Sequence, residues 1–261
     1  MPKSKSNLIQ SVDRALRILE CFSRKESELG VTEIANRLDL HKSTTFGILN
    51  TLENRGYLCQ NPENGKYKLG LKLFELGKLV EYGMDLRTSS LPYLKKLVDK
   101  YGETAHLAMR DGDQVIYIDK VEGEKAIKMS SQVGKRAYIY CTGVGKAVLA
   151  FMPEDNIKDI VKNIKFHKFT LNTITDLNEL KLELEKIRNK RYCIDNEEIE
   201  VGLKCVAAPI MNYKNVSVGS ISISGPTSRM NDERVDLISK DIKYVAVKIS
   251  ETLGYKMHCN N

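Results

Sequence analysis

Residues 31–58, VTEIANRLDLHKSTTFGILNTLENRGYL, carry the clearest structural signal in this chain. Apolar side chains recur there at helical spacing in two groups, Ile34, Ala35 and Leu38 and then Ile48, Leu49 and Leu52. Only residues 39–42 separate the two patterns, and Gly56 follows the second. The spacing predicts two amphipathic helices joined by a short turn, with Thr32 and Ser43 as candidate N-caps.

The flanking segments extend this motif on both sides. Residues 12–22 repeat apolar side chains at helical spacing, which predicts a further helix with Ser11 as its candidate N-cap. After the second helix, two short strand-like runs flank Asn64-Gly65, a pair that favours a tight hairpin because both residues tolerate positive φ. Three helices followed by a hairpin predict a winged helix-turn-helix domain over residues 1–70.

The next segment, residues 71–86, predicts an apolar-rich helix with more hydrophobic faces than one small domain requires. Such a helix can join two domains or pack against its own copy in a dimer. We therefore expect a linker or dimerisation helix between the first domain and the rest of the chain.

Residues 87–261 mix the periodicities of strands and helices and predict a second, larger domain. The expected strands lie at 105–109, 114–118, 204–211 and 216–224, and the expected helices at 143–152, 155–163 and 177–189. A closing helix is predicted between Asn231, its candidate cap, and Gly254. The predicted fold class of the whole chain is α+β, with helices packed on an antiparallel sheet in the second domain.

Composition narrows the class of protein. The chain has 261 residues and is 42% hydrophobic, yet its apolar runs are far shorter than the ~18 residues that a membrane span needs. Its first residues lack the apolar stretch of a signal peptide. Six cysteines without a Cys-x-x-Cys spacing argue against zinc fingers and a disulfide scaffold. We expect a cytoplasmic protein with reduced thiols, no membrane association, no metal site and no cofactor.

The charge of the chain is compatible with a nucleic-acid partner but does not identify one. The net charge is +7, and residues 1–70 hold 11 basic and 8 acidic residues, so the excess in the first domain is small. Specific DNA binding would have to come from particular side chains.

Several segments resemble the IclR family of bacterial transcriptional regulators. In the first part these are SVDRALRILECFS (11–23), residues 31–58 and the wing ending in KYKLG. In the second part they are CTGVGKAVLA (141–150), DNEEIEVGLKCVAAPI (195–210) and VGSISISGP (218–226). The resemblance covers roughly residues 10–255. It implies a winged-helix DNA-binding domain, a linker helix, a GAF-like effector domain, and homodimers or tetramers on double-stranded operator DNA.

The second helix of a helix-turn-helix reaches base edges with its N-terminal residues. The candidate DNA contacts are therefore Lys42, Ser43, Thr44, Phe46, Gly47 and Asn50, with Lys66 and Lys68 on the wing as phosphate contacts. Asn50 can pair with adenine, whereas Phe46 can either contact thymine methyl groups or belong to the core. Alternatively, the helix is an ordinary surface helix and the lysines protect a solvated edge strand.

The family resemblance maps an effector pocket onto Met129, Gly143, Val144, Asp195, Cys205, Ser222 and Ser224. From the residues alone, 141–146 begins a helix whose backbone amides are either an anion site or a packing turn. Ser222 and Ser224, two apart on a strand, direct their hydroxyls to one side. Such convergent polar groups suit a small organic acid, although Cys205 alone is equally typical of a core cysteine.

The sequence thus predicts a DNA-binding transcriptional regulator, more often a repressor in this family, whose operator affinity depends on a small organic acid. Two alternatives come from other classes of protein. One is a GAF-like metabolic enzyme with Cys141 or Cys205 as nucleophile and His106 or His167 as base, although no motif supports catalytic residues. The other is a winged-helix protein-interaction module that does not bind DNA.

Overall fold

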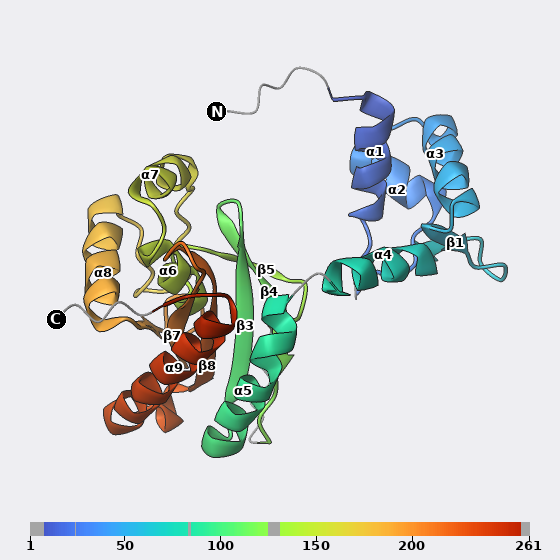
Figure 1. Ribbon diagram of the computed structural model, residues 1–261. Coiled ribbons are helices and arrows are strands. Elements are labelled where there is room, and N and C mark those ends of the chain that lie inside the picture. The colour runs from blue at the N-terminus through green and yellow to red at the C-terminus, as the bar shows by residue number, and fades with distance from the viewer. Residues whose placement is uncertain (1–7, 24, 83–84, 125–130, 257–261) are drawn as a thin grey trace. The chain divides into compact units, whose positions relative to one another are not determined.

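The computed structural model describes residues 8–23, 25–82, 85–124 and 131–256 of the chain. The chain divides into two compact units, Met1–Met84 and Asp85–Asn261 (Figure 1). Of the helices in the described residues, none is both long enough and apolar enough to cross a membrane.

The first unit is a winged helix-turn-helix, as predicted. Its elements are α1 (Gln10–Leu19), α2 (Val31–Leu38), α3 (Lys42–Asn54), β1 (Leu58–Gln60), β2 (Tyr67–Leu69) and α4 (Leu71–Tyr82). The strands β1 and β2 pair antiparallel, and Leu29 extends this ribbon through two backbone hydrogen bonds with Tyr67. The core of the unit is apolar and is formed by Ile18, Leu29, Ile34, Leu49, Leu52, Leu58 and Tyr67.

The three N-caps predicted for this unit are wrong, because each proposed residue is the second residue of its helix: Ser11, Thr32 and Ser43. The extended residues that precede the helices are Ile9, Gly30 and His41. At α2 the capping side chain is that of Glu33, in the first turn of the helix. Its carboxylate accepts the N–H of the preceding Gly30 at 2.6 Å.

The second unit is built on a six-stranded antiparallel sheet with the strand order β5-β4-β3-β8-β7-β6. The strands are β3 (Thr104–Asp111), β4 (Gln114–Val121), β5 (Arg136–Tyr138), β6 (Cys193–Asn196), β7 (Leu203–Met211) and β8 (Ser217–Pro226). All four expected strands are confirmed, and β5 and β6 were not predicted. The neighbouring strands β7 and β8 are almost completely buried.

Helices cover both faces of this sheet, which confirms the α+β class. The helices are α5 (Asp85–Tyr101), α6 (Gly143–Ala150), α7 (Glu154–Asn163), α8 (Leu177–Lys190), the 3-10 turn η1 (Thr227–Arg229) and α9 (Asp232–Thr252). On one face α6 packs against β7 and β8 and is itself covered by α8, whereas α5 and α9 pack side by side on the other (Figure 1). The predicted cap of the closing helix is confirmed, since the Asn231 side chain accepts the N–H of Arg234.

The helix expected over residues 71–86 corresponds to α4 and the start of α5. The structure assigns α4 to the first unit and α5, which packs against β3, to the second. The division between the units therefore lies between residues 84 and 85.

Candidate functional site

The outward face of α3 carries most of the residues predicted to contact DNA. Thr45, Leu49 and Leu52 face the core of the first unit. On the other side of the helix the predicted contacts are exposed, namely Lys42, Ser43, Phe46, Gly47 and Asn50, while Thr44 is half-buried. One face of α3 therefore anchors the helix, and the other is exposed and carries polar side chains together with Phe46.

Phe46 and Gly47 lie on this exposed face. The Phe46 side chain is 53% exposed and so does not belong to the core. A side-chain carbon placed on Gly47 would meet no atom within 4 Å, so the glycine is not required by packing within the chain. Both residues are placed where a DNA groove can be contacted, which was one of the two alternatives for Phe46.

The two wing lysines differ in their surroundings. Lys66 is half-buried, and its ammonium lies 3.3 Å from the Glu33 carboxylate. Lys68 is exposed on β2. Lys66 directly precedes β2, whereas Lys68 lies on this strand. Lys68 remains the better placed of the two for a phosphate contact.

Six of the seven predicted effector residues line one cavity of about 250 Å³ in the second unit: Gly143, Val144, Asp195, Cys205, Ser222 and Ser224. We call it the sheet cavity. The seventh, Met129, lies outside the described residues. The remaining lining comes from Tyr117, Ser131, Lys135, Arg136, Ala137, Tyr138, Thr142, Phe169, Ile199, Glu200 and Leu203.

Strand register explains why distant residues meet in the sheet cavity. Asp195 on β6 is directly opposite Cys205 on β7, and Cys205 is opposite Ser224 on β8. Ser222 lies two residues before Ser224 on β8 and therefore points to the same face of the sheet. The N-terminus of α6, with Gly143, packs over these strands.

The backbone amides at the start of α6 are already bound. The whole helix is buried, the Gly145 N–H donates to the Thr142 hydroxyl at 3.1 Å, and the Gly143 N–H donates to the Asp195 carboxylate. The possible anion site at this helix start is therefore occupied by the chain's own carboxylate. Burial raises the pKa of Asp195, although Lys146 and the two backbone N–H groups of Glu198 and Gly143 oppose this effect.

Positive charge reaches the sheet cavity from a different element. Lys135 and Arg136 line it at the start of β5, and Arg136 forms an ion pair with Asp111 at 2.5 Å. Sequence reasoning missed both residues, because the segment before β5 shows no helical or strand periodicity. A cation beside polar side chains allows the cavity to hold a small anion.

His106 on β3 is a second residue whose role the sequence did not show. Its Nε2 lies 2.8 Å from the Ser131 hydroxyl and its Nδ1 lies 3.4 Å from the Ser222 hydroxyl, and both serines line the cavity. Burial, with Lys120 adding to it, lowers the pKa of His106 to about 3. A neutral imidazole therefore orients two hydroxyls of the cavity.

The cysteines of the cavity region are not activated as nucleophiles. Burial raises the pKa of Cys141 to about 12 and that of Cys205 well above its usual value, so both are thiols at neutral pH. The hydrogen-bonding partners of His106 are serines rather than either cysteine. Within the described part of the chain, no group of three or more His, Cys, Asp or Glu side chains is arranged to hold a metal ion.

Comparison with known proteins identifies the family of both units. Residues 11–62 match the model of the IclR helix-turn-helix domain, and residues 80–251 match that of the bacterial transcriptional regulator IclR C-terminal domain. The transcriptional regulators XynR and KdgR of Escherichia coli K12 are each 36% identical to the chain. The alignments cover 95% of this chain and 98% and 94% of theirs.

Solved structures show the same architecture. The crystal structure of the Thermotoga maritima IclR protein has a TM-score of 0.79 at 35% identity, covering 95% of this chain and 100% of that one. An IclR homolog from Microbacterium hydrocarbonoxydans, solved with 4-hydroxybenzoate, has the same fold, with a TM-score of 0.83 at 22% identity over 94% and 99% of the two chains. Each of these alignments spans nearly the whole of both chains. The chain belongs to the IclR family of bacterial transcriptional regulators, and it is a DNA-binding regulator rather than an enzyme.

Proposed function

We propose that this protein is a repressor that binds a palindromic operator through α3 and leaves it when a small hydroxylated organic acid enters the sheet cavity. The observation that carries the proposal is the meeting of six predicted effector residues in one cavity, in a chain whose other unit exposes a recognition helix. Repression is supported by relatives such as the repressor AllR of Escherichia coli K12, 31% identical over 95% of the chain.

The chemical class of the effector follows from the lining of the cavity. Lys135 and Arg136 can receive a carboxylate, whereas Asp195, Ser222 and Ser224 can bind hydroxyl groups. The volume of about 250 Å³ lies just below the range of drug-sized ligand pockets, which favours a small molecule. The 4-hydroxybenzoate bound to the Microbacterium hydrocarbonoxydans homolog, a small hydroxylated acid, is consistent with this class.

The coupling between the two sites would act through the arrangement of two chains. In a homodimer, two copies of α3 would enter successive major grooves about one helical turn apart. An effector that binds one dimer arrangement more tightly than the other shifts the population towards that arrangement. Operator affinity then falls by the same factor by which DNA weakens effector binding.

Operator binding is tested by fluorescence anisotropy of the full chain on DNA from upstream of its own gene, with a scrambled duplex as the competitor. We expect sequence-specific binding whose affinity falls steeply between about 50 and 200 mM salt. Gluconate and 4-hydroxybenzoate serve as the first acids tested for release. Equal affinity for the scrambled duplex at every salt concentration would contradict the proposal.

A matched pair of variants tests the role of α3. Asn50→Ala should weaken binding to the operator by roughly 10- to 100-fold, because a bidentate base contact contributes ~1–3 kcal/mol. Asn54→Ala removes the same residue type one turn later, where the amide donates to the Asn50 carbonyl, and should leave affinity within about threefold. Similar losses in both variants would show that Asn50 reads no base.

A further inference from the structure

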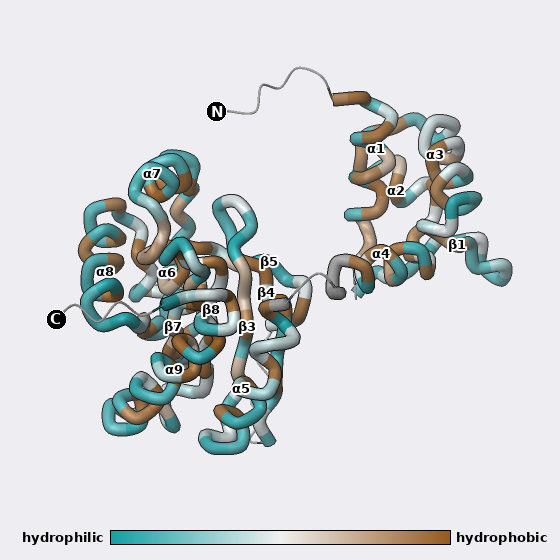
Figure 2. The backbone as a smooth tube through the Cα atoms, viewed as in Figure 1, coloured by the Kyte–Doolittle hydropathy of each residue, from teal (hydrophilic) through white to brown (hydrophobic). Residues whose placement is uncertain are grey.

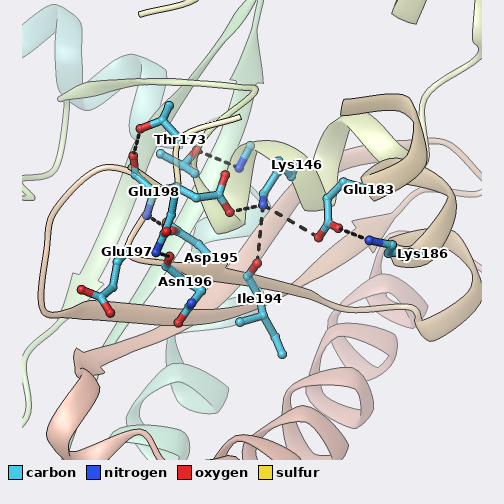
Figure 3. A network of polar contacts seen from close by, with 12 residues as sticks. Lys146, Thr173, Glu183, Lys186, Ile194, Asp195, Asn196, Glu197 and Glu198 are labelled. Carbon is cyan, nitrogen blue, oxygen red and sulfur yellow. Dashed lines mark hydrogen bonds and ion pairs between the residues drawn. The ribbon is translucent and has the colours of Figure 1, made fainter. Parts of the chain in front are cut away.

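A buried ion pair lies beside the sheet cavity (Figure 3). Lys146 on α6 is 1% exposed and pairs with the carboxylate of Glu198, which is 5% exposed. The same ammonium lies 3.5 Å from the Ile194 carbonyl and 3.9 Å from the Glu183 carboxylate on α8. The pair therefore joins α6 and α8 to the segment that follows β6.

Glu198 belongs to the connection between β6 and β7, residues 197–202, which we call the wall segment. The Glu198 N–H donates to the Asp195 carboxylate at 3.0 Å, and the Glu198 carbonyl accepts the Thr173 hydroxyl at 2.6 Å. The Thr170 hydroxyl donates to the Glu197 carbonyl at 2.6 Å. One residue thus connects the wall segment to a cavity carboxylate, to a second loop and to α6.

The wall segment forms one side of the sheet cavity. Ile199 and Glu200 line the cavity from this segment, next to Leu203 at the start of β7, and Phe169 lines it from the loop that carries Thr170 and Thr173. Both pieces of wall are irregular backbone, without a ladder of hydrogen bonds along their length. Backbone hydrogen bonds close the wall segment on itself, from the Glu197 N–H to the Leu203 carbonyl and from the Leu203 N–H to the Glu200 carbonyl. Its attachment to α6, to Asp195 and to the loop of Thr173 comes from the contacts of Glu198, which Figure 3 shows.

Stability alone does not account for this pair. Burying two charges is often no better for stability than an apolar pair of the same volume, because desolvation offsets their attraction. The second oxygen of Glu198, Oε2, is buried and has no hydrogen-bond partner among the described residues. Lys146 also faces more carboxylates than it can neutralise, since Asp195 and Glu183 are close by. These contacts cost stability, so their presence is better explained by the wall segment that they hold in place.

We propose that Lys146 and Glu198 are positioning residues of the sheet cavity, which hold the wall segment closed over the bound effector. The inference rests on the proposed role of this cavity as the effector site. Breaking the pair from either side should open the wall while the sheet beneath it keeps its fold.

The test uses Cys205, whose thiol lies in the cavity and is 7% exposed, as a reporter of access. The full chain is treated with iodoacetamide, a small neutral probe, and the alkylation rate of each cysteine is followed by mass spectrometry. In Glu198→Gln and in Lys146→Met, Cys205 should react at least about tenfold faster than in the wild type, a change of ~1.4 kcal/mol in closure. Cys21 and Cys59, in the first unit, should keep their rates.

An ion pair with a buried carboxylate and a half-buried arginine provides the control, and neither of its residues lines the cavity. Glu103 is 3% exposed and pairs with Arg229 at 2.7 Å. Glu103→Gln should destabilise the second unit comparably but leave the Cys205 rate within about twofold of wild type. Circular dichroism confirms that each variant is folded, and either single variant of the Lys146–Glu198 pair is sufficient.

The double variant Lys146→Met/Glu198→Gln separates positioning from stability. Removing both members of the pair removes the unpaired charge that each single variant leaves. Resistance to urea should therefore recover part of the loss seen in the single variants, although Asp195 no longer has Lys146 nearby, whereas Cys205 should remain reactive. The proposal is overturned if Cys205 stays slow in both single variants, if Glu103→Gln accelerates it equally, or if the double variant restores its protection. The assay contains neither DNA nor effector, so a failure of operator binding would not affect its outcome.

Discussion

At the scale of single residues, Glu198 makes the stability of the fold depend on pH. Burial raises the pKa of this carboxyl to about 7; Lys146 opposes the shift, and Asp195 and Glu183 add to it. Its ordinary value is 4.5, so the folded chain binds the proton more tightly than the unfolded chain does. The stabilisation is complete below the unfolded value and is lost as the pH rises through about 7.

This shift predicts a pH-dependent difference between the wild type and Glu198→Gln, in which the titrating group is absent. The unfolding free energy of the wild type, relative to the variant, should fall by about 2 kcal/mol between roughly pH 5 and pH 8. Urea unfolding of the full chain, followed by circular dichroism at both pH values, measures this difference. If the wild type and the variant differ in unfolding free energy by the same amount at both pH values, Glu198 does not titrate between them.

At the scale of elements, apolar spacing was sufficient to predict the helices of the first unit but not where they begin. Ser11, Thr32 and Ser43 mark the first turns, and the residue two positions earlier in each case supplies the extended backbone at the helix start. Side-chain type reports a preference for the first turn, whereas the start depends on where the backbone leaves the extended conformation. The cap of α9 was predicted correctly because Asn231 both has the extended backbone that precedes the helix and accepts a hydrogen bond with its side chain.

Exposed apolar side chains distinguish two helices of the first unit. Figure 2 shows hydrophobic residues along α1, and Val12 and Leu16 there are more than half exposed. On α4, Leu71, Phe74 and Leu79 are 81%, 64% and 68% exposed. So much exposed apolar surface on one helix is typical of an interface with another chain.

We therefore expect α4 to support a homodimer. Phe74→Ser/Leu79→Ser should shift the full chain from dimer to monomer at about 10 µM. The reason is that burying each of these side chains in an interface would contribute ~1.5–3 kcal/mol to the free energy of association. Light scattering on a sizing column measures the molar mass. Glu75→Ser, on the same helix with its carboxylate paired to Lys72, is the control and should stay dimeric. An unchanged molar mass in the double variant would place the interface elsewhere.

At the scale of the whole molecule, the sheet cavity is a product of long-range strand pairing. Periodicity predicted β7 and β8 separately, but the order β3-β8-β7-β6 places Asp195, Cys205 and Ser224 in one row, and no local pattern encodes that order. The members of the row came from the family resemblance alone. Lys135 and Phe169 were missed because they lie in irregular segments, where side-chain spacing carries no information about direction.

The division of the chain into two units predicts that effector response and DNA binding can be lost separately. Ser222→Ala/Ser224→Ala removes two hydroxyls from the sheet cavity, so release from the operator should need at least about tenfold more acid, while operator affinity without acid stays within about twofold. Anisotropy titrations with and without 4-hydroxybenzoate or gluconate measure both quantities. Ser239→Ala, a buried serine on α9 outside the cavity, is the control and should change neither. If the folded double variant no longer bound the operator, the serines would be part of the coupling between the units rather than of the ligand site.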